Sequence, residues 1–308
     1  MHESDKNGKY PLYVFLLILQ CAIFGFSFVI VKMLLDYGNS PFLLMGIRFF
    51  IGAISLVFAG LVLNAKTSQK RTVFAYNKKE LLYGAISGIA LFAAFGFQTF
   101  GANFTTPAKN SLLTGVFVVF VPLVSMFLKK KFSAKPIVIA LICFVGAGTV
   151  SGISASDLNI NLGDILTIIC GIAFAIHFLL LERYAPDSDI DTIKFTEVQL
   201  FVVAITSVLS SILLESHSYV NVDWQNSLLW FVFIGVISTA VTYLIQTIVQ
   251  AKLTANTVSV ISCTDSVFAI TTSLILGYEI LSGRLLIGGV IIIVSMIMAS
   301  VQKQDSKV

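Results

Sequence analysis

One carboxylate, Asp265, is isolated from every other charge in its part of the sequence. It follows Lys252 by 13 positions and precedes Glu279 by 14 positions. A run of this length can cross a bilayer as a helix, which would place Asp265 near the middle. Charges at that depth are expensive and usually face a bundle interior or a wet cavity. Asp265 could therefore exchange a proton or attract a substrate amine. The alternative is a buried polar bond between helices.

A histidine in another apolar run is a second candidate. His177 follows Phe174 by about one helical turn. A neutral imidazole both donates and accepts hydrogen bonds, and it changes charge near physiological pH. The alternative is a histidine packed in the core between helices. Sequence spacing alone does not place His177 beside Asp265.

A polar stripe marks the run that ends near Lys252. Gln246 and Gln250 are four residues apart and share one helix face, and Thr239 and Tyr243 extend the same line. We expect this stripe to be the wall of a cavity that hydrogen-bonds a substrate, or else to join helices. The other uncharged candidates with the same two interpretations are Gln98, Asn110 and Thr114.

The elements that must position these residues are membrane helices. The chain has 308 residues, of which 57% are hydrophobic and only 12% charged, and its mean hydropathy is +0.93. This composition excludes a soluble enzyme, a disordered protein and a disulfide-rich secreted module. The apolar runs between charges predict ten transmembrane helices, at about 9–32, 36–66, 80–109, 109–129, 135–157, 164–182, 197–215, 223–252, 252–279 and 284–303.

The basic residues predict how the chain crosses the membrane. If the N-terminus is inside, 16 of the 20 Lys and Arg residues fall in inside segments and three at outside ends. This bias predicts a multi-pass protein of the plasma membrane with both termini cytoplasmic. The net charge of +4 is thus a topology signal. No basic segment is interleaved with aromatics, so no nucleic-acid partner is expected.

The sequence indicates neither a metal site nor a cofactor. Cys21, Cys143, Cys170 and Cys263 all lie inside predicted spans, with spacing that fits neither paired disulfides nor a metal site. There is no zinc-protease motif, phosphate loop or nucleophile elbow. We therefore expect no cofactor, no metal and no catalytic residue, and hence no enzyme.

The chain divides into two halves, residues 1–153 and 154–308, with five predicted spans each. Because five is odd, the second half enters the membrane from the opposite side. The predicted fold is therefore all-α, with ten transmembrane helices in two five-helix inverted repeats. Such repeats place the substrate near the midplane between the halves.

Short motifs in both halves share their order with a known family. They are Phe24-Gly25-Phe26-Ser27-Phe28, Arg48-Phe49, Phe97-Gln98-Thr99, Thr105-Thr106, Leu113-Thr114-Gly115 through Pro122, Gly163-Asp164, Ala175-Ile176-His177, Arg183-Tyr184-Ala185-Pro186, Thr264-Asp265-Ser266 and Gly277-Tyr278-Glu279. From about residue 12 to 301 the chain resembles the drug/metabolite transporter superfamily, specifically its ten-helix EamA-type members. The family usually has a proline where this chain has Ser266, which leaves open whether the helix is kinked there.

The resemblance implies secondary transport of a small organic solute, often an amino acid, metabolite or drug, and often outward. The resemblance also implies that Phe24 stands where the family often has a cavity-lining aromatic. Arg48 matches a family arginine with a structural role, and the alternative is direct contact with the substrate. Near the outer end of its span, Arg48 is expected to extend to the interface. We expect a cavity lined by spans one, three, four, six, eight and nine.

The predicted function is therefore a secondary transporter, with an exporter favoured and proton coupling through Asp265 as one option. The alternatives are a membrane-embedded sensor or assembly subunit without transport, and an intramembrane enzyme. The expected partners are a small-molecule solute, the lipid bilayer and, for the coupled mechanism, protons. The protein is expected to be a monomer or a homodimer.

Overall fold

The structure is a computed structural model that describes residues 4–66, 75–129, 161–215 and 222–301, together with scattered positions between 135 and 149. Within these residues every regular element is a helix. Most of the predicted fifth span, with Cys143, lies outside the described residues. So do the loop positions Lys70, Lys130 and Asn221.

The helices follow the predicted apolar runs. In chain order they are α1 (Ser4–Asp36), α2 (Pro41–Lys66), α3 (Lys78–Ala102), α4 (Pro107–Thr114), α5 (Phe117–Lys129), α7 (Leu162–Tyr184), α8 (Thr192–Leu214), α9 (Trp224–Gly235), the π-helix η2 (Val236–Val241), α10 (Thr242–Gln250), α11 (Ala255–Ser262), α12 (Asp265–Ile275) and α13 (Gly283–Val301). Eight stretches of the described chain are long and apolar enough to cross a membrane, and Gly283–Ser295 is a shorter apolar helix. Nine of the ten predicted spans are thus matched by helices.

Three spans are interrupted. The fourth divides into α4 and α5 and the ninth into α11 and α12, while η2 interrupts the eighth. Both divided spans begin with an eight-residue helix behind a threonine N-cap, Thr106 and Thr254. This shared pattern relates the two halves of the chain.

The break in the ninth span needs no proline. The Ser266 N–H donates to the Cys263 carbonyl at 3.2 Å, and Thr264 N–H donates to Ile261 at 3.0 Å. Bonds between residues three apart tighten the helix and stop its α-helical ladder. The helix of the ninth span is therefore interrupted directly before Asp265, although this chain has Ser266 where the family usually has a proline.

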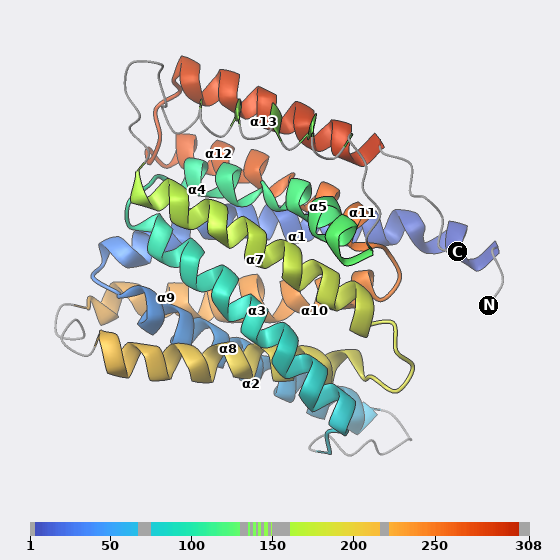
Figure 1. The fold of residues 1–308 in the computed structure, drawn as a ribbon. Coiled ribbons are helices and arrows are strands. Elements are labelled where there is room, and N and C mark those ends of the chain that lie inside the picture. The colour runs from blue at the N-terminus through green and yellow to red at the C-terminus, as the bar shows by residue number, and fades with distance from the viewer. Residues whose placement is uncertain are drawn as a thin grey trace.

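Helices from different halves pack closely. α2 contacts α8, α3 contacts α7 and α8, and α1 contacts α12, while α13 lies along one edge of the bundle (Figure 1). A Cβ added at Gly84 would lie 2.7 Å from Val198, and one at Gly88 would lie 2.8 Å from Val202. These two glycines, spaced as a small-xxx-small pair, let α3 approach α8.

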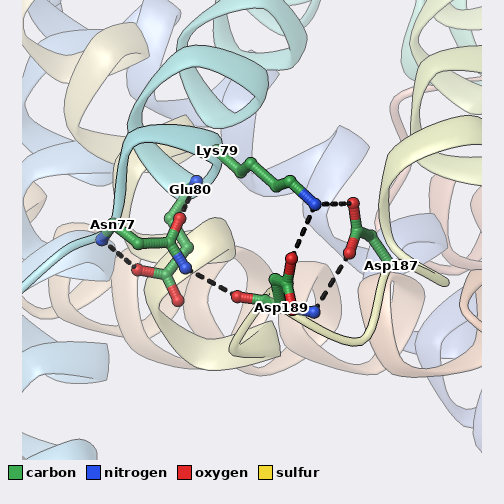
Figure 2. Close-up of polar contacts among 5 residues, drawn as sticks. All are labelled: Asn77, Lys79, Glu80, Asp187 and Asp189. Carbon is green, nitrogen blue, oxygen red and sulfur yellow. Dashed lines mark hydrogen bonds and ion pairs between the residues drawn. The ribbon is translucent and has the colours of Figure 1, made fainter.

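A charged cluster joins the halves at one end of the bundle (Figure 2). Lys79, at the start of α3, reaches Asp187 at 2.9 Å and Asp189 at 2.7 Å in the loop between α7 and α8. Glu80 forms a capping box with Asn77 and accepts the Asp191 N–H at 3.0 Å. These contacts join the first half of the chain to the second. We call Asn77, Lys79, Glu80, Asp187 and Asp189 the Lys79 cluster.

Among the described residues, the opposite end is joined by hydrogen bonds. Glu215 accepts the N–H groups of Phe42 and Leu43 at the start of α2, each at about 3.0–3.1 Å. Asn39 donates to Ser227 at 2.9 Å, again linking the two halves. Polar contacts between the halves are therefore present at both ends of the bundle.

Candidate functional site

A cavity of ≈ 50 Å³ lies among helices of both halves. Its lining residues come from α1, α2, α3, α4, α5, α7, α10, α11 and α12, and they are Gln20, Phe24, Ser27, Phe28, Val31, Arg48, Phe95, Gln98, Asn110, Thr114, Phe117, Phe174, Phe178, Tyr243, Gln246, Ser262 and Asp265. A buried water needs roughly 10–15 Å³ of such space. In this conformation the cavity has room for only a few water molecules.

The breaks in both divided spans lie at this cavity. Thr114 is the last residue of α4 and Phe117 the first of α5, and Ser262 and Asp265 bracket the matching break in the other half. Broken helices are tolerated inside a membrane where they line a cavity. Their free backbone groups and helix-end dipoles are then available to a polar ligand.

Asp265 lines the cavity as expected. It is the first residue of α12 and only 7% exposed. Ser266 Oγ lies 3.3 Å from Asp265 Oδ1 and 3.1 Å from the Ser111 carbonyl oxygen, so its single hydrogen can be donated to either oxygen. Within the described chain Asp265 forms no ion pair. Its carboxylate is thus held at the helix break with room for a ligand or a proton.

The two glutamines of the polar stripe have different roles. Gln246 lines the cavity and accepts a hydrogen bond from Gln20 at 3.1 Å. Gln246 then donates to Gln250 at 3.3 Å, and Gln250 donates to the Phe178 carbonyl at 3.0 Å. Gln250 is absent from the lining of this cavity and contacts a neighbouring helix. It supports Gln246 from behind because it points towards α7.

Three uncharged candidates from the first half meet in one network. Gln98 donates to Thr114 at 3.2 Å, Thr114 contacts Asn110 at 3.4 Å, and Asn110 donates to the Gln98 carbonyl at 3.1 Å. All three residues line the cavity. Their side chains hold each other in place while they present amide and hydroxyl groups to the space.

His177 does not reach the cavity. Its side chain is fully buried, with Nε2 3.0 Å from Gln199 Oε1 on α8. Its neighbours on α7, Phe174 and Phe178, line the cavity instead. His177 is thus not part of this cavity wall, because its face of α7 is turned towards α8.

Arg48 also differs from expectation. Its side chain is 2% exposed and lines the cavity, so it does not extend to the membrane surface. Nε donates to Thr239 Oγ1 at 3.1 Å, and the guanidinium lies 4.8 Å from the Phe95 ring centre and 5.3 Å from that of Phe49. The missed signal was its depth, because seven residues from the start of α2 correspond to about 10 Å along the helix.

Aromatic side chains form much of the wall. Phe24 packs edge-on against Tyr243 at 5.7 Å, and Tyr243 lies 5.9 Å from Phe95. Phe24 and Tyr243 were expected in the lining and are found there. Sequence reasoning missed Gln20, Ser27, Phe95 and Ser262, because an amide, a serine or a phenylalanine on an apolar helix does not reveal its direction. Because Arg48 on α2 lines the cavity, the wall includes the second span as well as the six spans that were expected.

The described residues contain no group of three or more His, Cys, Asp and Glu side chains that could hold a metal ion. Cys21, Cys170 and Cys263 are buried free thiols. Among the side chains that line the cavity, the polar groups are one carboxylate, one guanidinium, amides and hydroxyls.

The comparison with protein families agrees with this architecture. The model of the EamA-like transporter family matches residues 11–152 and again residues 161–301. The chain belongs to the EamA-like transporter family. It is accordingly a multi-pass membrane transporter with two EamA repeats, as the resemblance to the drug/metabolite transporter superfamily implied.

Individual relatives support the same conclusion. This EamA-like chain is 26% identical over 302 residues to an uncharacterized transporter of Archaeoglobus fulgidus, covering 97% of this chain and 90% of that one. It is 24% identical over 242 residues to the uncharacterized transporter YoaV of Bacillus subtilis, covering 77% and 79%. A crystal structure with 19% identity superposes with a TM-score of 0.63 over 94% of this chain and 95% of the other, which supports the fold.

Proposed function

We propose that this protein is a secondary transporter that carries a small organic solute, such as an amino acid or a drug-like metabolite, out of the cell. The observation that carries the proposal is the cavity, in which both helix breaks and polar side chains from both halves converge. Solute sites of transporters built from repeats lie at the repeat interface, next to broken helices.

Alternating access supplies the mechanism. The Lys79 cluster joins the halves at one end, and the Glu215 and Asn39 contacts join them at the other. Opening one set while the other stays closed would expose the cavity to one side at a time. Because the cavity here accommodates only a few waters, the solute enters when one end opens and the cavity widens.

Proton coupling is the role we assign to Asp265. It is a buried carboxylate at a helix break, bonded to a serine hydroxyl, with no cationic partner in the part of the chain that the structure describes. A carboxylate in this position is expensive to keep charged and alone, so proton binding and solute binding there are linked.

The test is flux into and out of liposomes that contain the purified protein, with a panel of radiolabelled metabolites and with or without a pH gradient. We expect at least one solute to move faster than in empty liposomes and to respond to the gradient. Gln98→Ala, which removes a lining amide, should slow that flux, whereas Gln225→Ala at an exposed position should not. Folded protein that moves no member of a broad panel would contradict the proposal.

A further inference from the structure

Arg48 introduces a permanent positive charge into the centre of the bundle. Its guanidinium is 2% exposed and contributes to the wall of the same cavity as Asp265. It is held from three sides, by Thr239 on η2 and by the rings of Phe49 and Phe95. These contacts fix the direction of the side chain and prevent it from reaching solvent.

The Arg48 guanidinium forms no ion pair in the described parts of the chain. Its hydrogen-bond acceptors there are the Thr239 hydroxyl at 3.1 Å and the Ser238 carbonyl at 3.5 Å, both neutral. Asp265 lines the same cavity, but its carboxylate oxygens are not within 4.0 Å of the Arg48 guanidinium nitrogens, since no ion pair joins the two residues. A buried guanidinium without an anion is costly, so the cavity favours a ligand that supplies one.

The shape of the group selects the anion. A guanidinium has five N–H donors in a planar fork, of which two have the partners named above. A fork of this kind matches the two oxygens of a carboxylate. A doubly charged phosphate is disfavoured, because Asp265 adds negative charge to the same wall. Phe95 lies beside the fork, and Phe24 and Phe174 line the same cavity, which suits a solute with an apolar body.

We propose that Arg48 binds the carboxylate of the transported solute, so that the substrates are organic monocarboxylates, including amino acids, with an apolar body. This inference rests on the proposed function, because it takes the cavity to be the site of the transported solute. It adds a binding residue and a chemical class, and it treats Arg48 as a ligand-binding group in place of a purely structural one.

A ligand series tests the class on the unmodified protein. The matched probes are 3-phenylpropanoate, 3-phenylpropanamide and 3-phenylpropylamine, which share a body and differ in the terminal group. Hexanoate and phenylalanine extend the set of carboxylates. In calorimetry on the purified full-length protein, we expect at least one carboxylate to bind 10- to 100-fold more tightly than the amide or the amine. Equal binding of the three matched probes, tighter binding of the amine, or no binding by any carboxylate would overturn the inference.

Variants test the residue. Arg48→Gln should lower carboxylate affinity at least tenfold, and Arg48→Lys should be intermediate because it retains the charge without the fork. Arg284→Gln removes an exposed arginine as the matched control and should change nothing. If Arg48→Gln does not fold, Arg48→Lys and protection of Arg48 from phenylglyoxal by 3-phenylpropanoate, read by mass spectrometry, replace it. Unchanged affinity in Arg48→Lys together with no protection would overturn the assignment.

The two proposals fail in different ways. If liposome flux is absent for every solute while carboxylates still bind through Arg48, the transport proposal fails, and the inference is reduced to a carboxylate-binding site at Arg48. If the protein moves amines or amides and ignores carboxylates, the transport proposal stands and the binding inference fails.

Discussion

Gly25 on α1 lies against the main chain of Asp265, and a Cβ added to Gly25 would come within 2.7 Å of the Asp265 carbonyl oxygen. The same Cβ would lie 2.4 Å from Phe268 Cβ and 2.8 Å from the Ala269 nitrogen. None of these atoms is the end of a flexible side chain. The absence of a side chain at Gly25 therefore sets how closely α1 can approach the break that presents Asp265 to the cavity.

Gly25→Ala should destabilise the protein by about 1–3 kcal/mol, because α1 and α12 must separate to admit the methyl group. The measurement is thermal unfolding of the purified protein in detergent. Gly96→Ala is the control, since its added Cβ would meet nothing nearer than Phe42 at 4.0 Å. An unchanged melting temperature in Gly25→Ala would show that this contact does not hold the two helices together.

Lys79→Gln should make the cavity more accessible from the end of the bundle that carries the Lys79 cluster. The substitution removes both ion pairs to the α7–α8 loop. Accessibility is measured as the rate at which a membrane-impermeant maleimide labels a cysteine at the cavity position Ser27, with the native cysteines replaced. Lys78→Gln removes the adjacent exposed lysine and should leave the rate unchanged. Equal rates in both variants would remove the cluster from the gating mechanism.

The effect of Lys79→Gln on this labelling rate should depend on pH only in acid. The backbone N–H of Asp189, and then the Lys79 ammonium, hold the pKa of Asp187 below its usual value. A carboxyl group with a lowered pKa stabilises the closed contact fully above about pH 4 and loses this effect as the pH falls through the lowered pKa. Because maleimide reacts with the thiolate, the rate itself rises with pH, so the protein with and without Lys79→Gln is compared at each pH. We expect the ratio of the Lys79→Gln rate to the rate with Lys79 intact to be constant from pH 5 to 8 and to fall towards one in stronger acid. A fall in this ratio between pH 7 and 5 would point to another titrating group.

Asp265→Asn should abolish the response of transport to a pH gradient while the protein still folds, because the amide keeps the size and the hydrogen-bonding capacity of the carboxyl group. Flux is measured in liposomes, and thermal stability is measured on the same preparation. Asp36→Asn, which alters a more exposed carboxylate paired with Lys32, is the control. Normal stability with undiminished pH-driven flux would rule out the coupling role. Loss of folding would favour the role in helix packing.

Ser266→Ala should lower stability by about 1 kcal/mol, since Ser266 Oγ donates to the buried Ser111 carbonyl at 3.1 Å and accepts from Ser111 Oγ at 3.2 Å. Ser273→Ala, also buried on α12, should cost little because the Ser273 hydroxyl has no partner among the described residues. Unfolding of the two variants in parallel measures the difference. Equal stabilities would mean that the serine pair does not support the helix break.

The sequence alone determined the class of protein and its helices. Apolar runs of about 20 residues between charges must cross the bilayer as helices, because backbone groups have no other partners in hydrocarbon. The breaks in the fourth and ninth spans, after Thr114 and after Ser262, were not predicted. The distribution of Lys and Arg still predicts the topology, with cytoplasmic reporter fusions after Lys70 and Lys130 and external ones near Asn161 and Asn221.

Only the tertiary structure decided which polar residues face the cavity. Gln246 and Gln250 share one face of α10, yet Gln246 reaches the cavity while Gln250 bonds to α7. His177 and Phe178 are adjacent in sequence, but the histidine turns to α8 and the phenylalanine to the cavity. In a soluble helix, water marks the outer face and the polar residues reveal it. In a membrane helix both lipid and core are apolar, so the direction of a lone polar side chain depends on neighbours that come from distant parts of the chain.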